Sequence, residues 1–383
     1  MAKLFGVKDF FHGLGSISEL KNITGKKAAI VIGGSSVKLN GSLTTVESIL
    51  KESGLEYVIF EGVEADPSIQ TVRRGAALFQ EFQPEWIIGL GGCSAIDAAK
   101  AMWAVYEHPE LTFEQMAQIG GIPQLRNKAR FVAIPSTSGT GTEITALAVI
   151  TDPDKGVKYP LVSYELLPDL SIIDGNLCKS MPANVTANTG LDALTHCVEA
   201  YVSNIEDNYA DAFAKGGIQL IFDNLLKAIE TPENADVRQK MHDASALGGY
   251  AFTNVWLGIA HSLAHQIGGQ FGIPHGCANA IVLPSVIRFN MKATERYADL
   301  ARLIGKETSE DFAQAVEALR YASGIPASIK EYGISQEQWY AAIPAMAEHA
   351  FADPCTGFNP RKPSVEELAE IYKAIYLGEV VSF

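Results

Sequence analysis

Two short stretches of the chain place carboxylate and imidazole groups at a spacing that metal sites use. Asp192 and His196 are four residues apart in a segment without proline and with helical apolar spacing, so they share one helix face. His261 and His265 repeat the spacing, and His275 follows beyond a glycine pair and a proline. One carboxylate with neutral imidazoles suits Fe²⁺, Zn²⁺, Ni²⁺ or Mn²⁺. Spacing alone leaves open whether His265 or His275 completes a four-ligand site.

The helix that carries His261 is predicted to end at Gly268-Gly269, with Pro274 letting the chain turn back toward His275. No cysteine stands at the matching positions, which argues against a thiolate site. The five cysteines are scattered and odd in number, which predicts free thiols rather than a disulfide framework. They are Cys93, Cys178, Cys197, Cys277 and Cys355.

The composition excludes several classes of protein. The 383 residues carry a net charge of -14 and have 47% hydrophobic and 19% charged residues, as in an ordinary globular protein. Without a basic cluster the chain is not expected to bind nucleic acid. It has no eighteen-residue apolar run and no signal-peptide pattern, so we expect no membrane association and a cytoplasmic location.

Two kinds of pattern divide the chain near residue 182. Up to about residue 174, short β-branched runs alternate with amphipathic stretches, which predicts βαβ units on a mainly parallel sheet. The expected strands are 28–32, 57–60, 86–90, 131–134, 146–151, 158–162 and 170–173. Beyond the boundary only helical periods follow, at 207–231, 235–252, 255–267, 277–291, 309–323, 335–349 and 364–377. We therefore predict an α/β nucleotide-binding domain, residues 1–181, and an all-helical metal-binding domain, residues 182–383.

Glycine-rich turns follow three of the expected strands. Strand 86–90 runs into 89–100, where backbone N–H groups at a helix start suit a phosphate. A second turn, 135–143, adds hydroxyl groups, and two such turns in one sheet favour a dinucleotide. The third, Gly33-Gly34-Ser35, lacks the carboxylate that accepts the ribose 2′-OH of NAD, and Ser35, Ser36 and Lys38 supply donors instead, which favours NADP.

With these pieces in place, the sequence resembles the iron-containing (group III) alcohol dehydrogenases along nearly its whole length. The turn at Gly33 is similar to the NADPH-preferring, butanol-dehydrogenase-like branch, whereas NAD-preferring relatives usually carry Asp there. The stretches that carry the resemblance are 91–100, 136–143, 189–196, 258–265 and 274–279. It implies a Rossmann-like domain followed by a helical domain, as in the dehydroquinate synthase-like fold.

The resemblance implies a role for each candidate site residue. Asp192, His196, His261 and His275 would hold Fe²⁺, and Zn²⁺ or another divalent ion fits the same ligands. His265 would then line the pocket for substrate and nicotinamide, as the candidate catalytic proton relay. Contacts to NADP(H), or alternatively NAD(H), are implied for Gly33, Gly34, Ser35, Gly91, Gly92, Ser94, Asp97, Ser136, Thr137, Thr140, Thr145 and Lys158.

Two positions depart from the family pattern. Cys93 stands where a third glycine is usual, so the turn must differ locally if that position needs a positive φ. Asp66 stands where Asn is more usual, which affects any adenine or ribose contact there.

The expected function is reversible hydride transfer between NADP(H) and a small primary alcohol or aldehyde, in a homo-oligomer that is a dimer or higher. The alternative within redox chemistry is an NAD-dependent diol or lactaldehyde reductase. Alternatives of other classes are a metal-dependent lyase of the dehydroquinate synthase type and a non-catalytic binding protein. The lyase would need several Lys or Arg for its anionic substrate, and the motif stretches of the second domain hold none.

Overall fold

A computed structural model describes residues 3–118 and 120–380. These residues form two compact units. The first contains the described residues up to Thr137, together with Gly141–Ser180 and Glu233–His242. The second contains Ser138–Thr140, Met181–Pro232 and the described residues from Asp243 onward.

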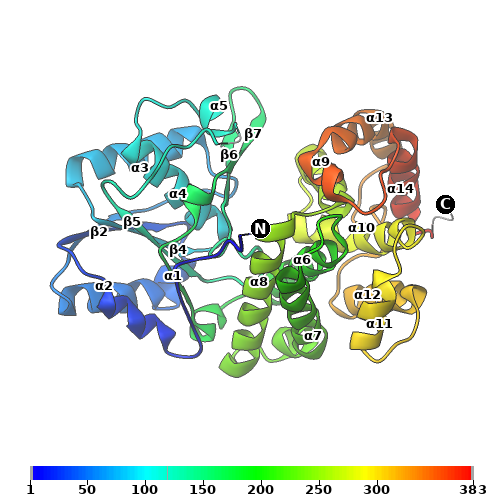
Figure 1. The fold of residues 1–383 in the computed structure, drawn as a ribbon, viewed down its shortest axis with the longest axis horizontal. Coiled ribbons are helices and arrows are strands. Elements are labelled where there is room, and N and C mark those ends of the chain that lie inside the picture. Colours follow the sequence, from blue (N-terminus) through cyan, green and yellow to red (C-terminus); the bar gives the residue numbers. More distant parts are fainter. Residues whose placement is uncertain (1–2, 119, 381–383) are drawn as a thin grey trace. The chain divides into compact units, whose positions relative to one another are not determined.

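The first unit is built on a six-stranded sheet whose described strand pairs are all parallel (Figure 1). This confirms the predicted α/β class. The strand order is β1 (Asp9–His12), β8 (Leu170–Ile173), β5 (Arg130–Pro135), β4 (Trp86–Gly91), β2 (Lys27–Ile32) and β3 (Glu56–Phe60). Two of the expected strands, β6 (Leu147–Asp152) and β7 (Val157–Val162), instead form a separate antiparallel pair. Strand β1 was not predicted.

Helices cover both faces of this sheet because consecutive strand residues point to opposite sides. Ile87 belongs to the core under α3 (Ile69–Phe82) and α4 (Cys93–Glu107), whereas Ile88 belongs to the core under α2 (Ser42–Glu52). Figure 1 shows α3 and α4 on one side of the sheet and α2 on the other. The shorter elements of this unit are η1 (Ser16–Asn22), α1 (Ser36–Leu39), α5 (Phe113–Met116), η2 (Tyr164–Leu166) and η3 (Gly175–Cys178).

The strand register brings the glycine-rich turns to one edge of the sheet. Gly91 pairs with Pro135, and Leu90 pairs with Ile32 on the other side. The strands are parallel, so their carboxyl ends meet, and the turns after β2, β4 and β5 lie next to each other.

The second unit is helical, as predicted. Its elements are α6 (Ala183–Val202), α7 (Asn208–Glu230), α9 (Ile259–Phe271), α10 (His275–Asn290), α11 (Arg296–Leu303), α12 (Ser309–Ala322), α13 (Gln336–Ala352), η4 (Pro354–Phe358) and α14 (Val365–Leu377). Helix α8 (Ala235–Val255) contributes its first residues, up to His242, to the first unit. Helix α11 has no counterpart among the predicted helices.

The predicted end of α9 was wrong. Gly268 and Gly269 lie within the helix, which continues to Phe271 and ends at Gly272 in the left-handed conformation, with φ +66°. A helix stops where a residue adopts the left-handed cap, and a glycine that keeps helical angles does not provide one.

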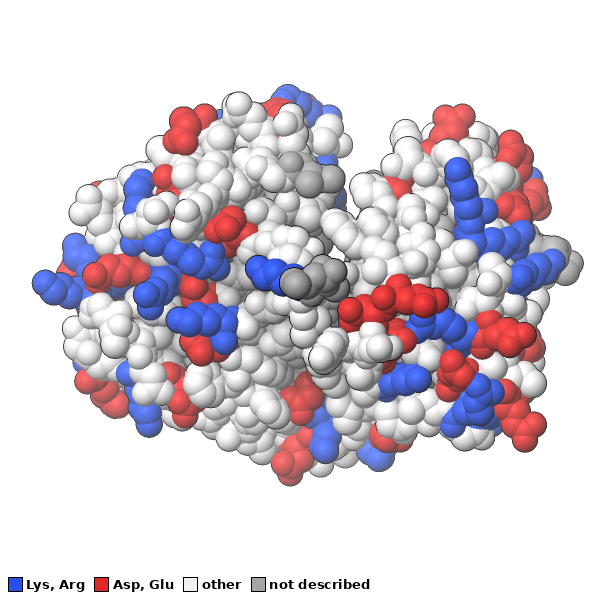
Figure 2. All heavy atoms as spheres, viewed as in Figure 1, with Lys and Arg blue, Asp and Glu red and all other residues white. Residues whose placement is uncertain are grey.

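Charged side chains are distributed over both units. Figure 2 shows Lys and Arg interspersed with Asp and Glu on the face in view. Within residues 3–118 and 120–380, no helix combines the length and the apolar character needed to cross a bilayer.

Candidate metal and nucleotide sites

Helices α6, α9 and α10 bring the predicted metal ligands together within the second unit. Asp192 lies on α6, His261 on α9, and His275 is the first residue of α10. Gly276 allows this approach, because a Cβ there would lie 2.0 Å from the carbonyl oxygen of Asn188 on α6. The small residue after His275 therefore lets the start of α10 meet the helix that carries Asp192.

The acceptor atoms of Asp192, His261 and His275 converge. One ligand atom from each lies within 4.8 Å of the other two. The His275 Nε2 and Asp192 Oδ1 atoms are 3.5 Å apart, and the His261 Nε2 and Asp192 Oδ1 atoms 3.9 Å. The buried Asn279 amide nitrogen lies among them, donating to Asp192 at 2.8 Å and lying 3.2 Å from each imidazole Nε2.

The other two candidate histidines flank this group. The His196 ring stacks on His261 with centroids 4.7 Å apart, and its Nδ1 atom is buried without a hydrogen-bond partner. His265 stacks on His275 at 5.5 Å, and its side chain is 42% exposed. The structure thus groups Asp192, His261 and His275 tightly, with His196 on the buried side and His265 on the exposed side.

The electrostatics of the cluster suit a cation. Burial raises the pKa of Asp192, but the nearby imidazoles outweigh this effect and hold it below its usual value. Burial, with His196 and His275 close by, keeps the pKa of His261 well below its usual value, so this imidazole is neutral. A carboxylate and imidazoles whose acceptor atoms converge form the donor set of a divalent transition metal. The unpartnered His196 Nδ1 and Asn279 Oδ1 atoms fit such an ion better than a closed hydrogen-bond network.

Cysteines do not compete for this role. All five are free thiols, as predicted. Burial raises the pKa of Cys197, next to His196 in the sequence, to about 12, and that of Cys277 to about 11. Both thiols are neutral at pH 7, so the available donors are nitrogen and oxygen.

Three residues around the cluster were not identified from the sequence. Glu199, Asn279 and Asp353 contact the candidate ligands or His265. Glu199 could have been found as a lone acidic residue in the apolar stretch that follows His196, and Asn279 lies within one of the family-like stretches. Asp353 gave no local signal, because it is separated from His265 by 88 positions in the sequence.

The turn after β4 offers backbone donors at the start of α4. Gly91 has φ +147°, and a Cβ there would lie 3.1 Å from the Ala95 side chain. Gly92 caps α4 without a side-chain hydrogen bond, and Gly92, Cys93 and Ser94 are half-buried. The first N–H groups of α4 are therefore available to an anion. Cys93 is the first helical residue and is not among those with positive φ, so this turn does not need a third glycine.

The side chain of Asp97 points into the protein. It is buried, and its carboxylate accepts hydrogen bonds from the Thr142 hydroxyl at 2.6 Å and the Val149 N–H at 3.0 Å. Lys100, one turn further along α4, donates to the carbonyl oxygens of Thr142, Thr145 and Leu147 at 2.6, 2.7 and 3.0 Å. Asp97 and Thr145 thus belong to the support of the second turn, and this geometry gives neither an exposed edge for a nucleotide.

The remaining residues of the second turn are divided between the units. Ser136 donates its N–H to the Gly91 carbonyl at 2.8 Å, which fixes this turn beside the first. Ser136 is buried and Thr137 half-buried in the first unit, whereas the half-buried Thr140 belongs to the second.

Two ion pairs lie at the outer positions of the predicted nucleotide site. Lys38, which follows Gly33-Gly34-Ser35, pairs with Glu61 at 2.6 Å. Lys158 pairs with Asp66 at 2.7 Å, and all four side chains are at least 43% exposed. Asp66 has φ +54°, a conformation that Asn and Asp tolerate better than most residues, so Asp can replace the usual Asn there.

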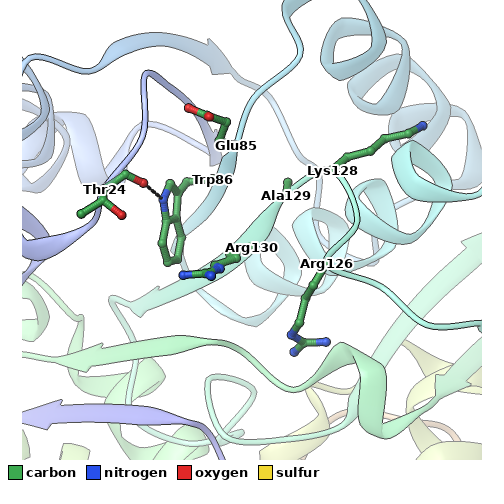
Figure 3. A pocket seen from close by; sticks show the side chains of 7 residues that line it. All are labelled: Thr24, Glu85, Trp86, Arg126, Lys128, Ala129 and Arg130. Atoms are coloured by element: carbon green, nitrogen blue, oxygen red, sulfur yellow. Dashed lines mark hydrogen bonds between the residues drawn. The ribbon is translucent and has the colours of Figure 1, made fainter.

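A surface pocket of about 250 Å³ lies at the opposite edge of the sheet (Figure 3). It is lined by Trp86 and Arg130, the first residues of β4 and β5, and by Arg126. The glycine-rich turns begin at the other ends of these strands, a strand length of about 20 Å away. This pocket is therefore separate from the predicted nucleotide site.

Comparisons with known proteins identify the family. Residues 8–175 match the model "Iron-containing alcohol dehydrogenase", and residues 186–376 match "Fe-containing alcohol dehydrogenase family, C-terminal". The chain belongs to the iron-containing alcohol dehydrogenase family. It is therefore an oxidoreductase, which removes the lyase and the non-catalytic alternatives.

The chain is similar to individual members of this family over most of its length. The chain is 46% identical to the NADPH-dependent butanol dehydrogenase of Clostridium saccharobutylicum, over 98% of both proteins. It is 40% identical to the bifunctional aldehyde-alcohol dehydrogenase of Escherichia coli over 92% of this chain, which spans only 43% of that longer protein. Among solved structures, a 1,3-propanediol oxidoreductase matches with a TM-score of 0.91 and 36% identity, covering 98% of this chain and 100% of the other.

Proposed function

We propose that the chain catalyses reversible hydride transfer between NADP(H) and a small primary alcohol or aldehyde, using Fe²⁺ held in the second unit. The carrying observation is the convergence of the Asp192, His261 and His275 acceptor atoms within 4.8 Å. It supports a divalent site in a chain whose family consists of alcohol dehydrogenases.

The proposed ligands are Asp192, His196, His261 and His275. Three already face one another, and His196, stacked on His261, has an unpartnered ring nitrogen that could turn toward the ion. Zn²⁺ or another divalent ion fits the same atoms, so the identity of the metal must be measured.

The nucleotide site is proposed at the carboxyl edge of the sheet. The turn Gly91, Gly92 and Ser94 would hold the pyrophosphate through backbone N–H groups at the start of α4. Thr137 would add a hydroxyl group, while Asp97 and Lys100 keep the second turn in place.

Two observations favour NADP(H) over NAD(H). Gly33-Gly34-Ser35 presents no carboxylate where NAD-binding sites use one for the ribose 2′-OH, and Lys38 supplies positive charge beside it. The relative that is 46% identical carries the name NADPH-dependent butanol dehydrogenase. The similarity to a 1,3-propanediol oxidoreductase supports the alternative of an NAD-dependent diol or lactaldehyde reductase.

In the proposed reaction, the chain's own residues position the reactants and handle the proton. When bound, the ion polarises the substrate oxygen as a Lewis acid and the nicotinamide gives or takes the hydride. His265, the exposed neighbour of His275, would accept the hydroxyl proton during alcohol oxidation and return it during aldehyde reduction.

The initial rate of butyraldehyde reduction tests the proposal. The protein is stripped of metal by a chelator, reloaded with Fe²⁺ under anaerobic conditions, and assayed with equal NADPH and NADH. Faster turnover with NADPH that is lost with the chelator is the expected result. Equal or faster turnover with NADH would support the diol-reductase alternative, which 1,3-propanediol and lactaldehyde then test. No turnover with either nucleotide across a panel of aldehydes would refute the proposed activity.

The homo-oligomeric state, a dimer or higher, and the cytoplasmic location stay predictions. Sedimentation of the purified protein tests the first, because a monomer at micromolar concentration would contradict it. Fractionation of cells that express the chain tests the second.

A further inference from the structure

Two histidines on α9 are held in the same way by carboxylates from different parts of the second unit. The Nδ1 atom of His261 lies 2.5 Å from Glu199, and the Nδ1 atom of His265 lies 2.8 Å from Asp353. An ionised carboxylate can only accept, so a neutral imidazole beside it carries its proton on Nδ1 and keeps the lone pair on Nε2. In His261 that lone pair faces the candidate metal group.

Asp353 is itself fixed by the local fold. It ends α13 and caps η4, where its Oδ1 atom accepts the Cys355 N–H at 2.9 Å and lies 3.4 Å from the Ser262 hydroxyl. Its other oxygen accepts from His265. The Asp353 side chain is 11% exposed against 42% for His265, so a mostly buried, anchored group orients an exposed one.

The second nitrogen of His265 is free to act. Among the described residues, the bond to Asp353 is the one hydrogen bond of this side chain. The ring stacks on His275 with planes inclined by 14°, which fixes its plane as well. One ring nitrogen is therefore held, the ring plane is supported, and Nε2 remains beside the candidate metal group.

We propose that Asp353 is a positioning residue that holds His265 in the Nδ1–H tautomer, with Nε2 presented to the substrate hydroxyl. The inference rests on the function proposed above. During alcohol oxidation His265 Nε2 would take the hydroxyl proton, and the oxidised nicotinamide, when bound, would accept the hydride from carbon. The proton then passes to water, and the aldehyde and reduced nucleotide remain. Asp353 touches neither substrate nor nucleotide and acts through His265.

A double-mutant cycle tests this role. Asp353→Asn keeps the size of the side chain and an oxygen for the Cys355 N–H, but weakens the acceptor for His265. We expect turnover to fall about 10- to 100-fold with metal content and aldehyde KM near wild type. In a His265→Ala background, the same substitution should change turnover by less than about twofold, because its route of action is already lost.

Ser262→Ala is the matched control, because it removes a side-chain neighbour of Asp353 Oδ1 and leaves the His265 bond intact. Its turnover should stay within about twofold of wild type. An equal loss from Asp353→Asn with and without His265 would show that Asp353 serves only the η4 cap, and would overturn the proposal.

A measurement of the tautomer is independent of turnover. In protein labelled with ¹⁵N-histidine and loaded with diamagnetic Zn²⁺, the His265 signals are assigned by their loss in His265→Ala. The wild type should show a protonated Nδ1 and a bare Nε2, and Asp353→Asn should shift His265 toward the other tautomer. If Asp353→Asn does not fold, Asp353→Glu replaces it and should keep the wild-type tautomer and recover most turnover.

The outcomes separate this inference from the proposed function. A wild type that turns over no aldehyde removes the proposed function and the role of Asp353 with it. An active wild type whose His265 carries its proton on Nε2, or whose turnover survives Asp353→Asn, overturns the role of Asp353 alone.

Discussion

Two groups of polar side chains can be compared: the histidine cluster of the second unit (Asp192, His261 and His275) and the lysine cluster of the first (Lys100 and Asp97). Both contain buried ionisable groups, but their polar atoms face different partners. Around Asp192, three acceptor atoms converge on the single amide nitrogen of Asn279, and His196 keeps a buried nitrogen without a hydrogen-bond partner. Around Lys100, each ammonium hydrogen has a carbonyl oxygen to bond, and Asp97 receives two donors. A group of acceptors with one donor among them favours a cation, whereas a buried ammonium group with three carbonyl acceptors supports the backbone.

The largest effect on activity is expected from removing a ligand of the proposed metal site. Asp192→Ala removes the single carboxylate of the ligand group and should abolish bound metal and lower turnover by roughly 10³-fold, the equivalent of several kcal/mol of Lewis-acid stabilisation. Metal analysis of anaerobically purified protein and the aldehyde assay measure both. His349→Ala, on an exposed position of α13, is the control. Full metal content in Asp192→Ala would mean that Asp192 does not bind the metal and that its cluster has only a structural role.

Substitutions in the lysine cluster should lower the stability of the fold. Lys100→Met leaves three buried carbonyl oxygens without a donor and removes the positive charge near Asp97, so it should lower the free energy of unfolding by about 3–5 kcal/mol. Adding Asp97→Asn removes the unpaired charge and should restore part of the loss. Thermal unfolding measures both variants, and metal bound by the folded fraction should be unchanged. An unaltered melting temperature for Lys100→Met would show that the charged group adds nothing to the turn.

The carboxylate behind His261 should affect metal affinity more than stability. Glu199 accepts the Ala260 N–H and the His261 Nδ1–H through different oxygens, and Gln can replace only one of them. Glu199→Gln should weaken Zn²⁺ binding about 10- to 100-fold, as measured by competition with a chromogenic chelator. Glu206→Gln, exposed beyond the end of α6, is the control. If Glu199→Gln and Glu206→Gln bound Zn²⁺ with equal affinity, the role of Glu199 would be limited to accepting the N–H group at the start of α9.

Glu143, which is buried near Lys100, should make the stability of the protein depend on pH. Burial raises the pKa of Glu143 to about 7 in the folded protein, despite the nearby Lys100 charge, and its Oε1 atom has no hydrogen-bond partner. A raised pKa means that the folded state binds the proton more tightly, so this contribution is complete below the unfolded value near 4.5 and is lost as pH rises through 7.

Comparing Glu143→Gln with wild type isolates this effect. The stability of the variant relative to wild type should increase by roughly 2–3 kcal/mol between pH 5 and pH 8, as measured by thermal unfolding at both values. Glu348→Gln, on an exposed part of α13, corrects for general charge effects. A constant difference between wild type and Glu143→Gln across this range would contradict the ionisation of Glu143.

Local sequence patterns predicted the parts of the site that depend on local geometry. The helical spacing of His261 and His265 gave their shared helix, and the glycines after β4 gave a helix start with free N–H groups. The pattern could not show that Asp97 turns inward, because its partners, Thr142 and Val149, belong to the following strand region. Strand alternation likewise predicted β6 and β7 but not that they pair with each other outside the main sheet, since pairing depends on contacts between distant residues.

The smallest effect is expected at the edge of the proposed nucleotide site, where the charged side chains are exposed rather than buried. Lys38 and Glu61 pair at 2.6 Å with side chains 43% and 50% exposed, so the pair itself is worth only about 0–1 kcal/mol. If Lys38 meets the 2′-phosphate, Glu61 competes for it, and Glu61→Gln should lower the KM for NADPH by up to about fivefold while leaving that for NADH unchanged. Lys38→Ala should raise the KM for NADPH alone. Added salt should shrink both differences, because exposed charges are screened, and parallel changes for NADPH and NADH would show that Lys38 does not read the 2′-phosphate.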